Sequence, residues 1–330
     1  MARLIKESEI RQLISMEEAV AAVRQTFKES YTHKVINPAK VNLDLGQDGG
    51  YPYHDGFINA MPAYVEWVHT AGLKWVVGMA GKRREAGLPY INSMMFLVDP
   101  ELGEFKSVLS GTYISNLRTG AQSAVALSEL IDKKDISIGL FGAGTQARAQ
   151  IEAISTCFNI TNLTVYNYKR SEAEIFAQEM QEYIKRPIQI TTDPQAATNH
   201  DVLITVTLAQ HPFLTREMIR PGTIVMPMGS FQEVSDDLIL SMDNLYVDHI
   251  EQAFHRGAMT HLFQQGKIDE SWVTATFEQL VMKRAPLPHL EKDMTLCIPI
   301  GTGALDVTLA GIVYDQAVQQ NLGTSFDFDA

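Results

Sequence analysis

A short glycine-containing turn is the first feature that indicates chemistry. Residues 142–147 read GAGTQA, a GxGxxA pattern, and they join the apolar run Ile136–Phe141 to the helical stretch Thr145–Cys157. In such a unit Gly142 allows the tight turn, and Gly144 lets a pyrophosphate approach the backbone and the helix N-terminus. A turn without a ligand is the alternative, but the context predicts a dinucleotide site. Its expected residues are Gly142, Ala143, Gly144, Thr145, Gln146 and Ala147.

The residues after the next predicted strand, Leu163–Tyr166, bear on which dinucleotide binds. An Asp or Glu at this point accepts hydrogen bonds from the ribose hydroxyls and favours NAD. This chain has an asparagine there, followed by two cations and a hydroxyl. A 2′-phosphate favours such a set, so we expect NADP(H) in preference to NAD(H); a solvated helix start is the alternative. The residues concerned are Asn167, Lys169, Arg170 and Ser171.

Two threonines close a later strand, Val202–Thr207. Ligands of doubly wound sheets bind at the carboxyl ends of the strands. Thr205 and Thr207 are therefore candidates for contacts on the nicotinamide side of the cofactor, with ordinary strand threonines as the alternative.

The elements that must position these residues alternate regularly from Ile136 onward. Helical stretches, Thr145–Cys157 and Ser171–Ile184, separate the early strands, and this alternation predicts a parallel sheet covered on both faces. The predicted strands are Ile136–Phe141, Leu163–Tyr166, Ile188–Thr191, Val202–Thr207, Thr223–Met228 and Leu245–Asp248.

The first part of the chain is organised differently. Ser15 and Glu18 have the spacing of a capping box at the start of a helix. From Lys40 to about Leu109 short strands follow one another without helices, and one hairpin turns through Pro100–Gly103. That segment therefore cannot form the parallel sheet. A helix with a small-residue face (112–131) follows it, and another helix is expected near the C-terminal end (303–320).

Length, composition and charge narrow the class of protein. The chain has 330 residues, 45% of them hydrophobic and 20% charged, which is typical of a globular protein of about two domains. The net charge of −12 argues against nucleic acid or an anionic membrane as a partner. Cys157 and Cys297 form no CxxC, and we find no signal peptide or spanning run, so we expect a cytoplasmic protein. The histidines lack ligand spacing, so we predict no metal site.

Several short motifs are spread along the whole chain. They are Met61-Pro62-Ala63, Leu73-Lys74-Trp75-Val76, Gly87-Leu88-Pro89, Leu117-Arg118-Thr119-Gly120-Ala121, the turn at 142–147, Gly229-Ser230 and Gly301-Thr302-Gly303-Ala304-Leu305-Asp306. In combination they resemble the ornithine cyclodeaminase/mu-crystallin family. The resemblance implies an α/β fold in which a Rossmann-type doubly wound parallel sheet (residues 119–305) is inserted into a mixed α/β domain (residues 1–118 and 306–330). That second domain would bind the substrate and form a homodimer.

The resemblance implies a reaction class more than a substrate. The family contains ornithine cyclodeaminases, alanine dehydrogenases and ketimine reductases, which share an imine next to a carboxylate and a hydride exchanged with nicotinamide. We therefore expect an NAD(P)H-dependent reductase or dehydrogenase acting on an α-imino or amino acid. An ornithine cyclodeaminase that recycles NAD, and a mu-crystallin-like binding protein, are the alternatives.

The resemblance also implies roles for particular residues. Arg118 matches the arginine that binds the substrate carboxylate, which a guanidinium can do bidentately. Lys74 matches the lysine near the reacting carbon, where it can act as acid or base. Lys40 falls where the family often has a second carboxylate-binding arginine. A structural ion pair, a strand-edge lysine and a surface lysine are the respective alternatives. Asp306 would line the site or cap a helix, and Tyr90 is expected to contact the substrate.

Two departures from the family pattern matter. Ser230 stands where cyclodeaminases carry an aspartate, and because a hydroxyl cannot act as a carboxylate base near neutral pH, ring closure with ammonia loss is disfavoured. Glu233 is the nearby acid that would have to replace it. Lys82, Arg83 and Arg84 lie where relatives often carry asparagine. If these cations face the pocket, the substrate has a second acidic group; a solvated loop is the alternative.

Overall fold

The computed structural model describes residues 1–46, 50–229 and 231–328. The chain divides into two compact units, here called unit 1 (Met1–Arg118 and Thr302–Ala330) and unit 2 (Thr119–Gly301). The second boundary precedes helix α11 (Gly303–Gln319), whereas the division expected from the sequence cuts this helix within its first turn. A continuous helix keeps those residues in unit 1.

Unit 1 is built on a mixed sheet. Its strand order is β16-β1-β7-β6-β5-β4-β2, with β3 paired to β4, and all neighbours are antiparallel except β1 and β7. The hairpin expected through Pro100–Gly103 is confirmed between β6 and β7. The strands are β1 (Ala2–Ile5), β2 (Val35–Ile36), β3 (Val41–Asp44), β4 (Gly56–Val65), β5 (Thr70–Met79), β6 (Ile91–Val98), β7 (Phe105–Ser110) and β16 (Thr324–Phe326).

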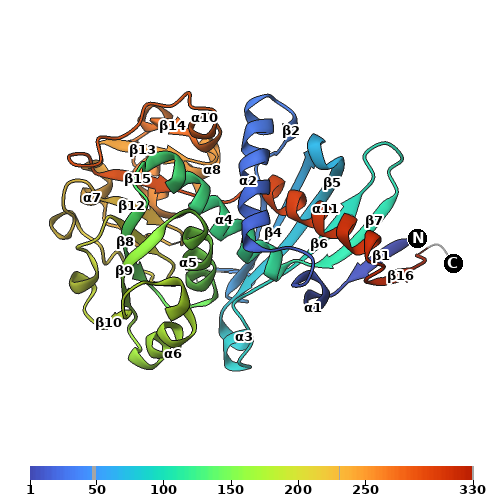
Figure 1. The fold of residues 1–330 in the computed structure, drawn as a ribbon, viewed down its shortest axis with the longest axis horizontal. Coiled ribbons are helices and arrows are strands. Elements are labelled where there is room, and N and C mark those ends of the chain that lie inside the picture. Colours follow the sequence, from blue (N-terminus) through green and yellow to red (C-terminus); the bar gives the residue numbers. More distant parts are fainter. Residues whose placement is uncertain (47–49, 230, 329–330) are drawn as a thin grey trace. The chain divides into compact units, whose positions relative to one another are not determined.

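Two long helices complete the core of unit 1. Helix α11 lies on one face of the sheet, where Ala304 and Val307 pack against Ala63 and Val65 of β4, and α2 (Met16–Tyr31) lies beside α11 (Figure 1). The predicted capping box at Ser15 and Glu18 is confirmed at the start of α2. The shorter helices of this unit are α1 (Glu7–Ile10), α3 (Gly81–Glu85) and the 3-10 turn η1 (Glu66–Val68).

The opposite face of this sheet carries apolar side chains that the chain leaves exposed. Burial alternates along β5: Lys74 and Val76 are 2% and 7% exposed, whereas Trp75 between them is 46% exposed. The strand register places Trp75 between Ala60 of β4 and Met94 of β6, and Met94 is 47% exposed. Exposed apolar patches of this kind mark interaction surfaces. We call this surface, centred on Trp75 and Met94, the open sheet face.

Unit 2 contains the predicted parallel sheet. Its strand order is β10-β9-β8-β11-β12-β15-β13-β14, and every paired neighbour is parallel. The first five strands along the chain thus take the order 3-2-1-4-5 of a dinucleotide-binding sheet. The strands are β8 (Asp135–Phe141), β9 (Asn159–Tyr166), β10 (Gln189–Thr191), β11 (Val202–Thr205), β12 (Ile224–Pro227), β13 (Asn244–Val247), β14 (Ala275–Thr276) and β15 (Thr295–Ile298).

Along the chain, the helices of unit 2 occur in the segments that connect these strands (Figure 1). Helix α4 (Thr112–Leu130) begins in unit 1 and continues into unit 2. Its small-residue face packs closely on α5, because a Cβ on Gly120 would collide with the backbone carbonyl of Ala149. The others are α5 (Thr145–Cys157), α6 (Arg170–Met180), α7 (Asp236–Leu240), α8 (Ile250–His255), α9 (Thr260–Gln264) and α10 (Phe277–Val281), with 3-10 turns η2 (Gln181–Tyr183), η3 (Pro194–Ala197), η4 (Arg216–Met218), η5 (Gly257–Met259) and η6 (Glu270–Trp272).

Among the helices that the structure describes, none combines the length and the apolar character needed to cross a membrane.

Candidate active site

The turn between β8 and α5 has the geometry that a pyrophosphate needs. Gly142 has a φ of +107°, and a Cβ there would lie 2.8 Å from the carbonyl oxygen of Val206. Gly144 caps α5 without a side-chain hydrogen bond, and a Cβ on it would meet nothing within 4 Å. Space is therefore left beside the helix N-terminus, whose first amides need an acceptor. Ala143 and Ala147 are buried, Thr145 is exposed and Gln146 is half-buried.

An arginine braces this turn from inside unit 2. Nη1 of Arg148 donates to the carbonyl oxygens of Ala143 at 2.7 Å and Gly144 at 3.1 Å, and its Nε donates to Oε2 of Glu179 at 2.6 Å. No motif in the sequence indicates this role of Arg148. Its position inside a helical stretch carries no signal, because its role depends on Glu179 in a different helix.

The residues expected at the ribose end of the cofactor lie together after β9. Nδ2 of Asn167 donates to the carbonyl oxygen of Lys169 at 2.9 Å and to Oε2 of Glu172 at 3.1 Å. Both cations are paired with acids of α6: Lys169 with Glu172 at 3.1 Å, and Arg170 with Glu174 at 3.0 Å. The pKa of Lys169 is raised above its ordinary value, mainly by the hydrogen bond to Glu172. Ser171 is exposed.

A buried glutamate joins the loops that follow β11 and β12. Oε1 of Glu233 accepts from the backbone N–H and the hydroxyl of Thr207, at 2.8 and 2.6 Å. Oε2 accepts from the hydroxyl of Thr205 at 2.7 Å and from the backbone N–H of Gly229 at 3.0 Å. Burial raises the pKa of Glu233, and these hydrogen bonds act to lower it. The hydroxyls of Thr205 and Thr207 thus hold Glu233, and their contact with a cofactor stays a prediction.

In unit 1 three charged side chains form a buried group, here called the triad. Nζ of Lys74 in β5 lies 2.6 Å from Oδ2 of Asp306 in α11, and Nε of Arg118 in α4 lies 3.0 Å from Oδ1 of Asp306. Lys74 and Arg118 also donate to the hydroxyl of Ser115, at 3.3 and 3.4 Å. The exposed fractions are 2% for Lys74, 8% for Arg118 and 0% for Asp306.

The charges of the triad do not cancel. Two cations share one carboxylate, so the three side chains together carry a formal charge of +1 in a buried place. A bound carboxylate would neutralise it, and the guanidinium has a fork that suits such a ligand. Asp306 is the common partner of the two cations, and the first turn of α11 is capped by another residue; that Asp306 lines a substrate site stays a prediction. Oδ1 of Asn37 accepts from the backbone N–H of Ala304 at 2.9 Å.

The remaining predicted residues are placed as follows. Lys40 is half-buried and directly precedes β3. Tyr90 stacks edge-on against Phe57, with ring centroids 6.4 Å apart. Their contact with a substrate stays a prediction. Ser230 lies outside the described residues.

The cation-rich loop expected near the substrate forms α3 and the residues after it. The guanidinium of Arg83 donates to the carbonyl oxygen of Pro89, so this cation closes its own loop. Lys82 is exposed, and the side chain of Arg84 lies outside the described part of the structure.

The three histidines that recur every six residues have separate contacts. Nδ1 of His249 accepts from the backbone N–H of Gln252 at 3.4 Å, His255 stacks on Phe263, and His261 hydrogen-bonds Asp236. Over the described ranges, no group of three or more His, Cys, Asp or Glu side chains is arranged to hold a metal ion.

Comparisons with known proteins bear on the whole chain. A model of the ornithine cyclodeaminase/mu-crystallin family matches residues 2–321. Alanine dehydrogenase of Archaeoglobus fulgidus is 30% identical over 329 residues, which cover 98% of each chain. Δ1-pyrroline-2-carboxylate reductase of Thermococcus litoralis, solved in complex with NADH and L-proline, has a TM-score of 0.91 at 28% identity and covers 98% of this chain and 100% of its own. An archaeal alanine dehydrogenase dimer with bound NAD has a TM-score of 0.91 at 29% identity, with 99% of each chain covered.

Proposed function

The chain belongs to the ornithine cyclodeaminase/mu-crystallin family, and from this premise we propose that it is a nicotinamide-dependent reductase of α-imino acids, or an amino-acid dehydrogenase in the reverse direction. The observation that carries the proposal is the buried triad with its excess positive charge. It supplies an anchor for a carboxylate and, beside it, an ammonium that can exchange a proton. An imine next to a carboxylate needs both.

Each candidate site residue of unit 1 then has a role in binding or in proton transfer. Arg118 binds the substrate carboxylate, and Lys40 adds a second positive charge. Lys74 donates a proton to the imine nitrogen during reduction and takes one back in the reverse direction. Asp306 holds the side chains of Lys74 and Arg118 in fixed positions, which limits the positions that the substrate can take. Tyr90 contacts the substrate.

Unit 2 binds the cofactor. When bound, nicotinamide supplies or accepts the hydride at the carbon that bears the carboxylate. The turn at Gly142–Ala147 holds the pyrophosphate, and Thr205 and Thr207 lie at the nicotinamide side. The preference for NADP(H) over NAD(H) rests on Lys169, Arg170 and Ser171 after β9.

We also propose a homodimer formed through the open sheet face. Trp75 and Met94 are adjacent there and about half exposed, which is costly unless a partner covers them. The archaeal alanine dehydrogenase that this chain resembles is a dimer. The cytoplasm is the proposed compartment, because a reducing environment keeps Cys157 and Cys297 as thiols.

Cyclodeamination is less well supported as a second candidate. The aspartate of cyclodeaminases is replaced by Ser230, and the four hydrogen bonds of Glu233 engage it within unit 2. A mu-crystallin-like binding protein would have no need of an ammonium held beside a carboxylate anchor.

The test is the absorbance of reduced nicotinamide over time. The protein is mixed with NADH or NADPH and a panel of imines: pyrroline- and piperideine-carboxylates, and pyruvate or oxaloacetate with ammonia or methylamine. Ornithine with catalytic NAD, and an ammonia readout, runs alongside. Oxidation by one imine without ammonia from ornithine supports the reductase. Ammonia from ornithine without net NADH would replace it with a cyclodeaminase, and cofactor binding without turnover of any imine would leave a binding protein.

A further inference from the structure

We propose that Glu172 is a specificity-determining residue: by holding Asn167 and Lys169 it opposes the two cations of the loop after β9 and shifts the selectivity towards the ribose 2′-hydroxyl of NAD(H), away from the 2′-phosphate of NADP(H). The proposal rests on the nicotinamide dinucleotide site of the proposed function. The sequence predicts NADP(H) from two cations, Lys169 and Arg170. In this proposal the acid Glu172 acts against them, and the selectivity depends on both effects.

Glu172 fixes which end of the Asn167 amide is offered to a ligand. The two neighbours of Nδ2, the carbonyl oxygen of Lys169 and Oε2 of Glu172, are both acceptors, so the amide nitrogen must face them. Both N–H groups are then used within the loop. The group of Asn167 that can take a further hydrogen bond is its carbonyl oxygen. A carbonyl oxygen at the end of this strand accepts from a ribose hydroxyl, as an aspartate would, and repels a phosphate oxygen.

Glu172 also engages the cation nearest to that position. Its second oxygen, Oε1, lies 3.1 Å from Nζ of Lys169, so one carboxylate bonds the amide and the ammonium at once. A 2′-phosphate would have to take Lys169 from this pair while approaching the negative charge of Glu172. An exposed ion pair of this kind is weak. A phosphate carries up to about two negative charges, however, so its repulsion from the carboxylate of Glu172 is about twice that of a single charge.

The neighbouring pair provides a matched control. Arg170 and Glu174 form an i,i+4 ion pair on the same helix, with side-chain exposures of 62% and 55% against 50% and 48% for Lys169 and Glu172. Asn167 donates to Glu172 and not to Glu174. Glu174→Gln therefore removes an equal charge from α6 without touching the orientation of Asn167.

The experiment measures binding rather than turnover. The full-length protein and the variants Glu172→Gln, Glu172→Ala and Glu174→Gln are titrated calorimetrically with NADPH and NADH without substrate. Glu172→Gln should raise the ratio of NADPH to NADH affinity by about fivefold or more, because the charge is lost while the amide oxygen of Gln still accepts from Asn167. Glu172→Ala should raise it further, because Asn167 can then turn its N–H groups to the phosphate. Glu174→Gln should raise the ratio less than Glu172→Gln does, because it releases Arg170 but leaves the orientation of Asn167 unchanged.

The outcomes separate this proposal from the proposed function. A ratio that stays within twofold in both Glu172 variants, or rises equally in Glu174→Gln, overturns the role of Glu172 while the dinucleotide site stands. Failure of the unmodified protein to bind either nucleotide overturns the dinucleotide site itself. Circular dichroism of each variant shows whether a lost signal reflects unfolding.

Discussion

At the scale of single residues, Lys74 allows the most direct test of the proposed chemistry. Lys74→Gln removes the proton donor and the excess positive charge of the triad, but it leaves the guanidinium of Arg118 held by Asp306, so a weakened carboxylate anchor stays in place. We expect kcat to fall by about 100-fold or more, with a much smaller change in KM. Steady-state kinetics on the imine found in the panel measure both constants.

A second lysine–aspartate pair serves as the control. Lys133 pairs with Asp201 at 2.9 Å in unit 2, and its side chain is 50% exposed. Lys133→Gln should leave kcat unchanged. If Lys74→Gln kept more than about a tenth of the original kcat, another group would have to deliver the proton, and the assignment to Lys74 would be wrong.

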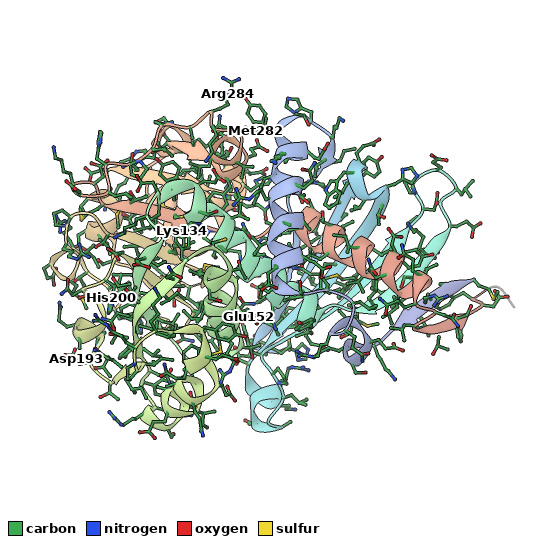
Figure 2. The ribbon with its side chains drawn as sticks, in the orientation of Figure 1. Lys134, Glu152, Asp193, His200, Met282 and Arg284 are labelled. Atoms are coloured by element: carbon green, nitrogen blue, oxygen red, sulfur yellow. The ribbon has the colours of Figure 1, made fainter. Side chains whose placement is uncertain are left out.

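His200, labelled in Figure 2, gives a residue-scale prediction about pH. It is 3% exposed, and Nε2 lies 2.9 Å from the hydroxyl of Thr164. Burial is the largest cause that lowers its pKa from the ordinary 6.5; Asp201 acts in the opposite direction and Arg220 in the same one. The unfolded chain therefore binds the proton more readily than the folded one. The contribution of neutral His200 to the free energy of unfolding should be complete above pH 6.5. It should be lost as the pH drops from 6.5 towards the lower pKa of the folded state.

The variant His200→Gln should flatten that dependence. Urea unfolding at pH 7.5 and 5.5 should show that the original protein loses more free energy of unfolding than the variant, by at most about 1.4 kcal/mol, the limit for one group whose pKa is 6.5 in the unfolded chain. His211→Gln, at an exposed histidine of the same unit, should behave like the original protein. Equal losses in all three proteins would show that the pKa of His200 is the same in the folded and the unfolded chain.

At the scale of elements, Glu233 connects the ends of β11 and β12. In Glu233→Gln the amide nitrogen must face a backbone N–H on either side, that of Thr207 or that of Gly229. A buried donor left without an acceptor costs about 1–3 kcal/mol. We expect the urea midpoint and the affinity for the nicotinamide nucleotide to fall together, whereas Glu174→Gln, at an exposed acid, should change neither. An unchanged midpoint would mean that the two loops do not depend on Glu233.

The helices and strands also show which parts of the structure can be predicted from the sequence. Its alternation predicted β8 to β13 and the turn at Gly142–Ala147, because these features depend on residues close together in the chain. It missed β15, whose four buried residues, TLCI, are too few to show a period. It also missed Arg148, whose partner Glu179 lies in the next helix, and Glu172, although its partners Asn167 and Lys169 lie only five and three residues before it. Asp306 was named as a candidate, but its pairing with Arg118, 188 residues away, is set by packing that no local pattern encodes.

At the scale of the whole molecule, the open sheet face predicts the assembly. Trp75→Glu places a charge at the centre of the face between Ala60 and Met94, and a charge buried in an interface without a partner is strongly unfavourable. Light scattering after size exclusion should give a dimer for the original protein and a monomer for Trp75→Glu. Leu102→Glu, at a turn residue that is 78% exposed, should stay dimeric. A dimer in all three proteins would place the interface elsewhere.

The position of Asp306 also has a consequence for how the protein is made. The ribosome releases β5 with Lys74 early, then the entire unit 2, and only afterwards the segment that carries the counter-charge on α11. While its insert folds, the nascent unit 1 therefore lacks the carboxylate that pairs with Lys74 and Arg118, and α11 does not yet cover its sheet. A chain that stops at Gly301 should yield a protease-resistant unit 2 joined to a degradable N-terminal segment. Equal resistance of both parts would show that unit 1 folds without α11.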